Sequence, residues 1–281
     1  LFVSPEADRA ALEARLPEAF PGLPVIGCTT AGEISPEGYS EGEIVAVGLP
    51  SDVFAVDFIG VDLGHIDSQA LIGRLIRARA GLARQQPDWE DEFAFVMVDG
   101  LSIREDELTT ALGPGLGPVP LFGGSAGDGI RFGQTFVLQD GQFRQGWAVL
   151  MLVRTACKVR VFSLNHLVPT ERRMVVTGAD PARRIVHQIN AEPAAKEYAR
   201  LLGKDPGQLT TFTFAAHPVV VRIGGSHHVR AIQQLAPNGD LVFFSAIDEG
   251  LVLTLAEPLD IAAHLDAALQ ELSVTGEPAA I

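Results

Sequence analysis

The chain has 281 residues, of which 47% are hydrophobic and 20% are charged, and this composition is typical of one large or two ordinary globular domains. The formal net charge of −14 repels phosphate backbones and anionic lipid surfaces, so we expect no nucleic-acid partner and no membrane partner. No apolar run approaches the roughly 20 residues that a membrane span needs, and the first residues show no signal-peptide pattern.

The two ends of the chain have the pattern of interrupted strands. Residues 1–3 resemble the end of a buried strand and residues 278–281 the start of another, so we expect both natural termini to be missing. Only two cysteines occur, Cys28 and Cys157. A disulfide framework is therefore not expected, and a reducing cytoplasm is the predicted location.

Helical and strand-like segments alternate over the first half of the chain. Apolar spacing predicts helices over residues 5–20 and 66–84, the second with its arginines on a solvated face. A third helix is expected from Ser102, which forms a capping-box pattern with Glu105. Short apolar runs predict strands at residues 25–28, 43–49, 53–60, 93–98 and 120–122. This alternation favours an α/β layer.

After residue 130 the pattern becomes strand-rich. Asp140-Gly141 and Asn238-Gly239 predict hairpin turns. Helices are expected over residues 193–202, opened by proline, and 260–272, capped by aspartate. The remaining apolar runs predict strands at residues 134–138, 142–152, 157–165, 172–177, 212–214, 219–223, 229–235, 241–245 and 251–255. We therefore expect an α/β part followed by an α+β part.

Three turns rich in small residues follow predicted strands, at residues 28–33, 99–102 and 123–129. Ligands of α/β sheets gather at the carboxyl ends of strands, so we expect one shared pocket there, with tight turns needed only for packing as the alternative. Arg104 or Arg131 would pair with a ligand carboxylate. The expected ligand-binding residues are Cys28, Thr29, Thr30, Ser102, Gly123, Gly124, Ser125 and Arg131. The third turn matches neither a P-loop nor a dinucleotide motif.

Two side chains suggest other chemistry. Cys28 would need a neighbouring base or cation to be nucleophilic, and no histidine lies near it in the sequence, so a small buried residue is the preferred interpretation. His166 ends an apolar run and could ligate haem iron, with Leu167 and Val168 against the porphyrin and Pro169 beside them. A histidine bonded to the backbone or to water is the alternative. No CxxCH motif occurs, so any haem would be held non-covalently.

Several motifs together resemble the FIST-domain family. The segments that resemble the amino-terminal FIST domain are residues 25–34, 99–102 and 122–128. The segments that resemble the junction and the carboxy-terminal FIST domain are residues 174–177, 189–194, 197–198 and 248–253. The resemblance implies a layered sheet-and-helix domain over residues 1–190 and a strand-rich domain over residues 191–281.

The resemblance also implies a function. It implies a bacterial, non-enzymatic sensor of small ligands that works with a sensor histidine kinase or a cyclic-di-GMP enzyme. One branch of the family that the chain resembles binds haem b and senses nitric oxide. Where relatives often carry Gly/Cys-Arg-Pro-Ile-Gly, residues 165–170 of this chain include His166. We therefore place a haem-based nitric oxide sensor first, a sensor of a metabolite such as an amino acid second, and a Cys28-dependent thiol enzyme third. The sequence does not decide between a monomer and a homodimer.

Overall fold

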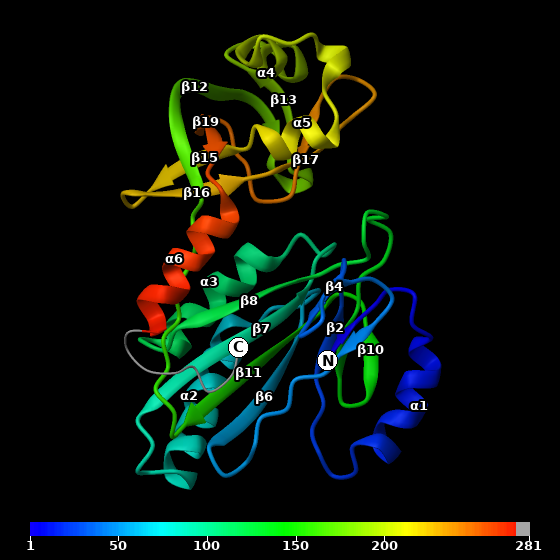
Figure 1. The fold of residues 1–281 in the computed structure, drawn as a ribbon, viewed down its shortest axis with the longest axis vertical. Helices are drawn as coiled ribbons and strands as arrows, with labels where there is room; N and C mark the ends of the chain where they lie inside the picture. Colours follow the sequence, from blue (N-terminus) through cyan, green and yellow to red (C-terminus); the bar gives the residue numbers. More distant parts are fainter. Residues whose placement is uncertain (274–281) are drawn as a thin grey trace. The chain divides into compact units, whose positions relative to one another are not determined.

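The computed structural model describes residues 1–273 and divides into two compact units, Leu1–Val161 and Phe162–Ile281 (Figure 1). The fold is mixed α/β, and the second unit is strand-rich, as expected. The chain from Leu167 onward pairs within the second unit's sheet. The strand expected at residues 278–281 lies outside the described residues.

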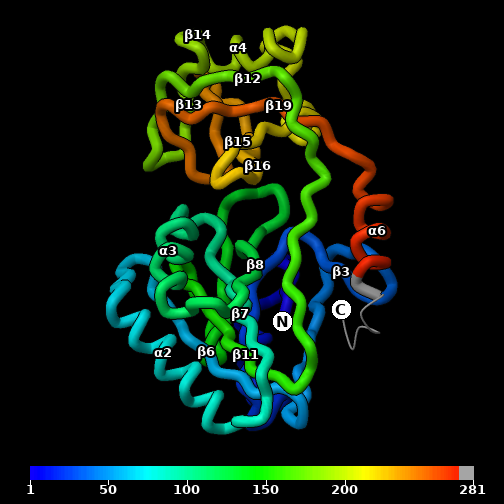
Figure 2. The backbone as a smooth tube through the Cα atoms, turned by 90° about the vertical axis from the view of Figure 1, so that its left-hand side faces the viewer, coloured from blue at the N-terminus to red at the C-terminus, as the bar shows by residue number. Residues whose placement is uncertain are grey.

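A four-stranded sheet forms the centre of the first unit. Its strands, in spatial order, are β6 (Phe54–Asp62), β11 (Trp147–Thr155), β7 (Asp91–Asp99) and β8 (Leu121–Ala126). β11 is antiparallel to β6 and β7, whereas β7 and β8 are parallel. Helices α2 (Ser68–Gln85) and α3 (Glu105–Leu116) lie on one face (Figure 2), where buried aliphatic side chains from helices and strands make the main core.

A five-stranded sheet of shorter strands covers the opposite face. Its strands, in spatial order, are β10 (Gln142–Arg144), β9 (Val137–Gln139), β2 (Gly27–Thr29), β1 (Phe2–Val3) and β5 (Ile44–Val45). Cys28 and Val137 pack there against Met97 and Val149 of the central sheet. Helix α1 (Arg9–Ala19) and the hairpin of β3 (Glu33–Ser35) and β4 (Gly38–Ser40) complete the unit.

Local sequence signals were wrong at three places in this unit. Helix α3 begins at Glu105 rather than after Ser102, because Ile103 has a φ of +58°, a left-handed conformation that interrupts a right-handed helix. Strand β8 continues through residues 123–126, which the sequence assigned to a turn. Of the arginines predicted on a solvated face, Arg79 instead pairs with Glu92 at 2.9 Å.

The second unit is built on one eight-stranded sheet. Seven strands follow one another in the spatial order β16 (Ser226–Arg230), β15 (Val219–Ile223), β19 (Val252–Pro258), β12 (Leu167–Asp180), β13 (Ile185–Ile189), β18 (Leu241–Phe243) and β17 (Ile232–Leu235), and β14 (Glu192–Pro193) pairs with β13. Helix α4 (Ala194–Leu202) buries Tyr198 in the core, and helix α6 (Ile261–Ser273) follows its expected cap, Asp260.

Two strands expected in this region do not form. Residues 157–165 contain no strand. Residues 212–214 lie in a short helix, α5 (Thr211–Ala216), because Thr210 and Thr213 make a reciprocal capping box at its start. Among residues 1–273, no helix is long and apolar enough to cross a membrane.

Candidate functional site

The three small-residue turns of the first unit meet at one end of its two sheets. The amide of Gly127 donates to the carbonyl of Thr29 at 2.9 Å, and the amide of Gly129 donates to the carbonyl of Thr30 at 3.3 Å. A Cβ added at Gly100 would collide with the backbone of the third turn, so this position requires glycine. The carboxyl ends of β2, β7 and β8 therefore lie together, where ligands of α/β sheets gather.

Asp99 joins these turns to the rest of the sheet. Its side chain is 4% exposed, and it accepts hydrogen bonds from the amides of Leu101 at 3.0 Å and Gly146 at 2.5 Å and from the Thr135 hydroxyl. A buried carboxylate that accepts this many bonds is compensated for its lost hydration. Asp99 therefore holds the scaffold in place and is not free to bind a ligand.

Two further buried carboxylates fix the other turns. Asp128 accepts hydrogen bonds from the amides of residues 132–134 at 3.0, 2.6 and 2.9 Å. Glu33 accepts from the Thr30 hydroxyl and from the amide of Glu43. Like Asp99, these carboxylates accept hydrogen bonds from the turns and thereby fix the conformation of the turns. Sequence spacing gave no sign of these internal bonds.

The residues predicted to bind a ligand differ widely in exposure. Cys28 and Thr29 are buried, Thr30 and Ser102 are half-buried, and Gly123, Gly124 and Ser125 are exposed. Arg131 is exposed and pairs with Glu6, and Arg104 donates to the Leu63 carbonyl at 3.2 Å. The structure brings the turns together, yet the two cavities described for this unit are lined by other residues.

One of these cavities, of about 230 Å³, lies where β6 ends and α2 begins. β6 runs in the same direction as β7, since both are antiparallel to β11, so the cavity is at the same end of the sheet as the turns. The lining residues are Gly60, Val61, Asp62, His65, Asp67, Ala70, Leu71, Arg74 and Trp147. This cavity, which we call the β6–α2 cavity, combines both signs of charge with an indole ring.

Its charged groups keep unused hydrogen-bonding capacity. Arg74 donates from Nη1 to the Gly60 carbonyl at 2.9 Å, which leaves other guanidinium N–H groups. Asp67 caps α2 by accepting from the Ala70 amide at 3.0 Å through Oδ1, and Asp62 uses Oδ1 for the Gly64 amide at 2.9 Å. Each of these carboxylates retains Oδ2 for a guest.

No residue of this cavity was predicted from the sequence. A signal was present, because Asp62 and His65 fall between a predicted strand and a predicted helix, and Asp67 is the second residue of that predicted helix. Trp147 enters from β11, far along the chain, so local spacing could not reveal it. Its indole N–H donates to Gln139 Oε1 at 2.9 Å.

Comparison with known proteins decides the family. The FIST N domain family model matches residues 1–192, and the FIST C domain family model matches residues 194–281. The chain belongs to the FIST family. No curated protein and no solved structure matches it. FIST domains are signal-transduction sensor domains that generally bind small ligands, so the chain is a sensor of this kind.

Cys28 of the FIST chain is expected to be a poor nucleophile. It is 6% exposed, and burial raises the pKa of its thiol to about 11, so little thiolate forms near neutral pH. With iodoacetamide at pH 8, mass spectrometry should find Cys28 modified more slowly than a free thiol and after the half-buried Cys157. Modification of Cys28 as fast as a free thiol would restore the thiol-enzyme hypothesis.

His166 lies in the second unit, immediately before β12. Its carbonyl accepts from the Leu259 amide at 2.7 Å, which continues the pairing of β12 with β19. Side chains alternate along a strand, so His166 and Val168 share one side and Leu167 and Pro169 the other. Leu167, 9% exposed, is buried with Val220 and Ala256. Within residues 1–273, no group of three His, Cys, Asp or Glu side chains could hold a metal ion.

Proposed function

We propose that this FIST chain senses a small zwitterionic metabolite, such as an amino acid, in the β6–α2 cavity. The observation that carries the proposal is the meeting of Arg74, Asp62, Asp67 and the Trp147 ring around about 230 Å³. The resemblance implies that the signal passes to a sensor histidine kinase or a cyclic-di-GMP enzyme.

The charges favour a guest with two opposite ionic groups. The guanidinium of Arg74 suits a carboxylate, because its N–H groups form a fork that matches two oxygens. The unused Oδ2 atoms of Asp62 and Asp67 suit an ammonium group. A dianion would meet repulsion from both aspartates, and a dication would meet repulsion from Arg74.

The size and the apolar walls restrict the remainder of the guest. A volume of about 230 Å³ holds only a small molecule. Val61 and Leu71 are buried and form an apolar part of the wall, and the half-buried Trp147 also lines the cavity. We therefore expect a short aliphatic side chain to be tolerated and a long one to be excluded.

The position of the cavity suggests how binding is transmitted. Asp67 and Arg74 belong to the start of α2, whereas Gly60 and Asp62 belong to the end of β6. A zwitterion that contacts both groups ties the helix to the strand. The ligand therefore binds more tightly to an arrangement of α2 and β6 that allows both contacts. This difference in affinity shifts the population toward that arrangement.

The test is calorimetric titration of the intact chain with neutral α-amino acids of increasing size. We expect a short-chain amino acid to bind and to change the fluorescence of Trp147. Arg74→Ala should weaken binding by roughly tenfold or more, as expected for loss of a charged hydrogen-bonding partner. Arg77→Ala removes a nearby exposed arginine of α2 outside the cavity and should bind as the wild type does.

Two results would reject this assignment. The first is that no amino acid in the series binds the folded protein. The second is that Arg74→Ala binds as tightly as Arg77→Ala. Because Arg74 also bonds to Gly60, circular dichroism must first establish that the variant is folded, and Asp62→Asn provides a second cavity variant whose side chain keeps its shape.

Haem remains a second candidate, and one observation favours it. His166 and Val168 share a side of β12, Val168 is 45% exposed, and the neighbouring Leu259 is 49% exposed, so an imidazole stands among uncovered apolar groups. These residues fit contact with a porphyrin, whereas Leu167 and Pro169 face the other way. Bound haem b would supply an iron atom that binds nitric oxide, and His166 would be its protein ligand.

A spectrum tests this second candidate. After reconstitution with haem, we expect a Soret band that nitric oxide shifts. His166→Ala should lose the histidine-ligated spectrum, whereas His228→Ala, a change at an exposed histidine on β16, should keep it. No Soret band in the wild type, or an identical spectrum for His166→Ala, would exclude His166 as a haem ligand.

A further inference from the structure

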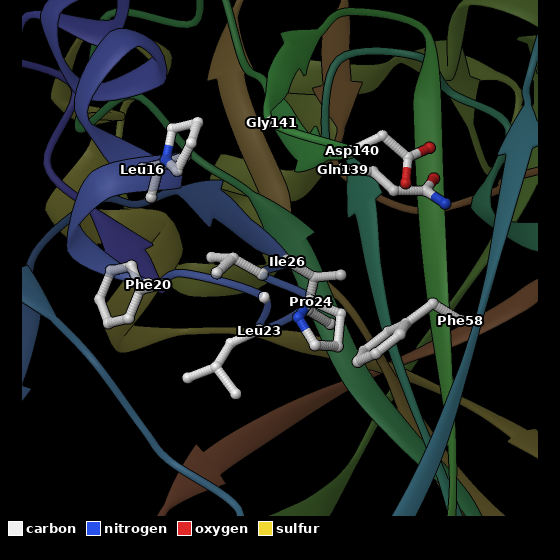
Figure 3. A pocket seen from close by; sticks show the side chains of 12 residues that line it. Leu16, Phe20, Leu23, Pro24, Ile26, Phe58, Gln139, Asp140 and Gly141 are labelled. Atoms are coloured by element: carbon white, nitrogen blue, oxygen red, sulfur yellow. The ribbon is translucent and has the colours of Figure 1, made fainter.

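A second cavity of the first unit, of about 330 Å³, lies between α1, β6 and the β9–β10 turn (Figure 3). Its lining comes from the end of α1, the segment that leads into β2, one residue of β6 and the β9–β10 turn. The lining residues are Leu16, Pro17, Phe20, Gly22, Leu23, Pro24, Val25, Ile26, Phe58, Gln139, Asp140 and Gly141.

The walls of this cavity are apolar and aromatic. Figure 3 shows Phe20 and Phe58 on opposite sides, with Pro24 and Ile26 between them. Among the described residues, no lysine, arginine or histidine lines the cavity, and Asp140 is its one charged lining residue. A guest that carries negative charge would therefore find no partner and would be repelled by Asp140.

The lip of the cavity is held open by a turn that two residues make rigid. The amide of Leu23 donates to the carbonyl of Phe20 at 3.2 Å, and Gly22 has a φ of +73°. Pro21 fixes its own φ, and glycine takes the left-handed position without strain, as in a type II turn. A site shaped before binding loses less conformational entropy when a guest enters.

One large apolar side chain at this lip, that of Leu23, is exposed to solvent. Leu23 is 64% exposed, whereas Leu16, deeper in the cavity, is 4% exposed. The amide oxygen of Gln139, which lines the cavity, is already engaged, because it accepts from the Trp147 indole. A guest would thus gain by burying apolar surface, and would meet little competition from unsatisfied polar groups.

We propose that this cavity binds a small neutral aromatic molecule about the size of indole. The two phenylalanine rings contact the guest from opposite sides, Ile26 and Pro24 form its floor, and Leu23 closes over it. The site adjoins the β6–α2 cavity, since Gln139 of its lining accepts from Trp147 of the other. The two lining sets share no residue, and this lining is mainly apolar whereas the other is mainly charged.

The experiment uses indole as the probe and saturation-transfer NMR on the intact chain, followed by titration. We expect saturation transfer to indole, and weaker binding of indole-3-carboxylate because of its charge. Leu23→Ser should weaken indole binding by roughly tenfold through lost apolar contact, and Ile26→Trp should abolish it by filling the space. Ile76→Ser changes an exposed residue of α2 outside the cavity and should have no effect.

The proposal is overturned if the wild type transfers no saturation to indole, or if Leu23→Ser binds indole as Ile76→Ser does. Since Leu23 is exposed, its variant is expected to fold even if Ile26→Trp does not. Equal binding of indole and indole-3-carboxylate would also contradict the apolar site. Arg74→Ala should leave indole binding unchanged, so failure of this proposal and failure of the amino-acid proposal are distinguishable.

Discussion

Asp99→Ala is expected to destabilise the first unit by about 4 kcal/mol. The substitution removes one buried acceptor and leaves three donors without a partner, on Leu101, Gly146 and Thr135. Each unsatisfied buried donor costs on the order of 1–3 kcal/mol, and the sum is reduced because the turn can relax. The loss should also loosen the turns at the carboxyl end of the sheet.

Urea unfolding followed by tryptophan fluorescence measures this effect in the relevant unit, since both tryptophans, Trp89 and Trp147, lie in it. Asp52→Ala is the matched control, because Asp52 is exposed and its loss should change stability by less than about 0.5 kcal/mol. Asp99→Asn should fall between the two, as it keeps one acceptor oxygen. A loss below about 1 kcal/mol for Asp99→Ala would contradict the structural role assigned to this carboxylate.

The second unit should lose stability in acid through Glu197. The side chain is 4% exposed, and the pKa of its carboxyl is lowered from 4.5 to about 2, first by the hydrogen bonds from Arg200 and further by that from Asn190. These bonds are 2.6 and 2.7 Å from Arg200 and 2.8 Å from Asn190. Glu197 thereby joins α4 to the turn between β13 and β14.

The pH range in which the second unit loses stability follows from the difference between the folded and unfolded pKa of Glu197. A carboxyl with a depressed pKa in the folded state adds stability that is complete above its unfolded pKa of about 4.5 and is lost as the pH falls through about 2. Glu197→Gln should therefore cost about 2 kcal/mol at neutral pH, and its difference from the wild type should shrink over that window. Hydrogen exchange of residues 185–202 measures the loss within the second unit.

Two variants check the cause. Arg200→Ala removes the largest contribution and should shift the acid transition to higher pH. Glu192→Gln breaks only an exposed pair with Lys196, at 3.0 Å, and should change stability little. Identical pH dependence for Glu197→Gln and the wild type would show that this carboxyl does not control the acid behaviour of the unit.

The sequence by itself determined the features that depend on neighbouring residues. The hairpin at Asp140-Gly141 forms as predicted, with both residues at positive φ, because few other pairs accept that conformation. Asp260 caps α6, and the apolar spacing of α2 gives the expected helix, because such signals act within a few residues. The ordered motifs also sufficed to identify the FIST family.

The tertiary structure decided whatever depends on a distant partner. Residues 123–126 are a strand because β7 offers them a parallel neighbour, although glycines alone favour a turn. The β6–α2 cavity needs Trp147, which only the pairing of β11 with β6 brings to Asp62. Sequence spacing encodes periodicity and turn chemistry, but not which strands pair, and this pairing brings Trp147 to the charged residues at the β6–α2 junction.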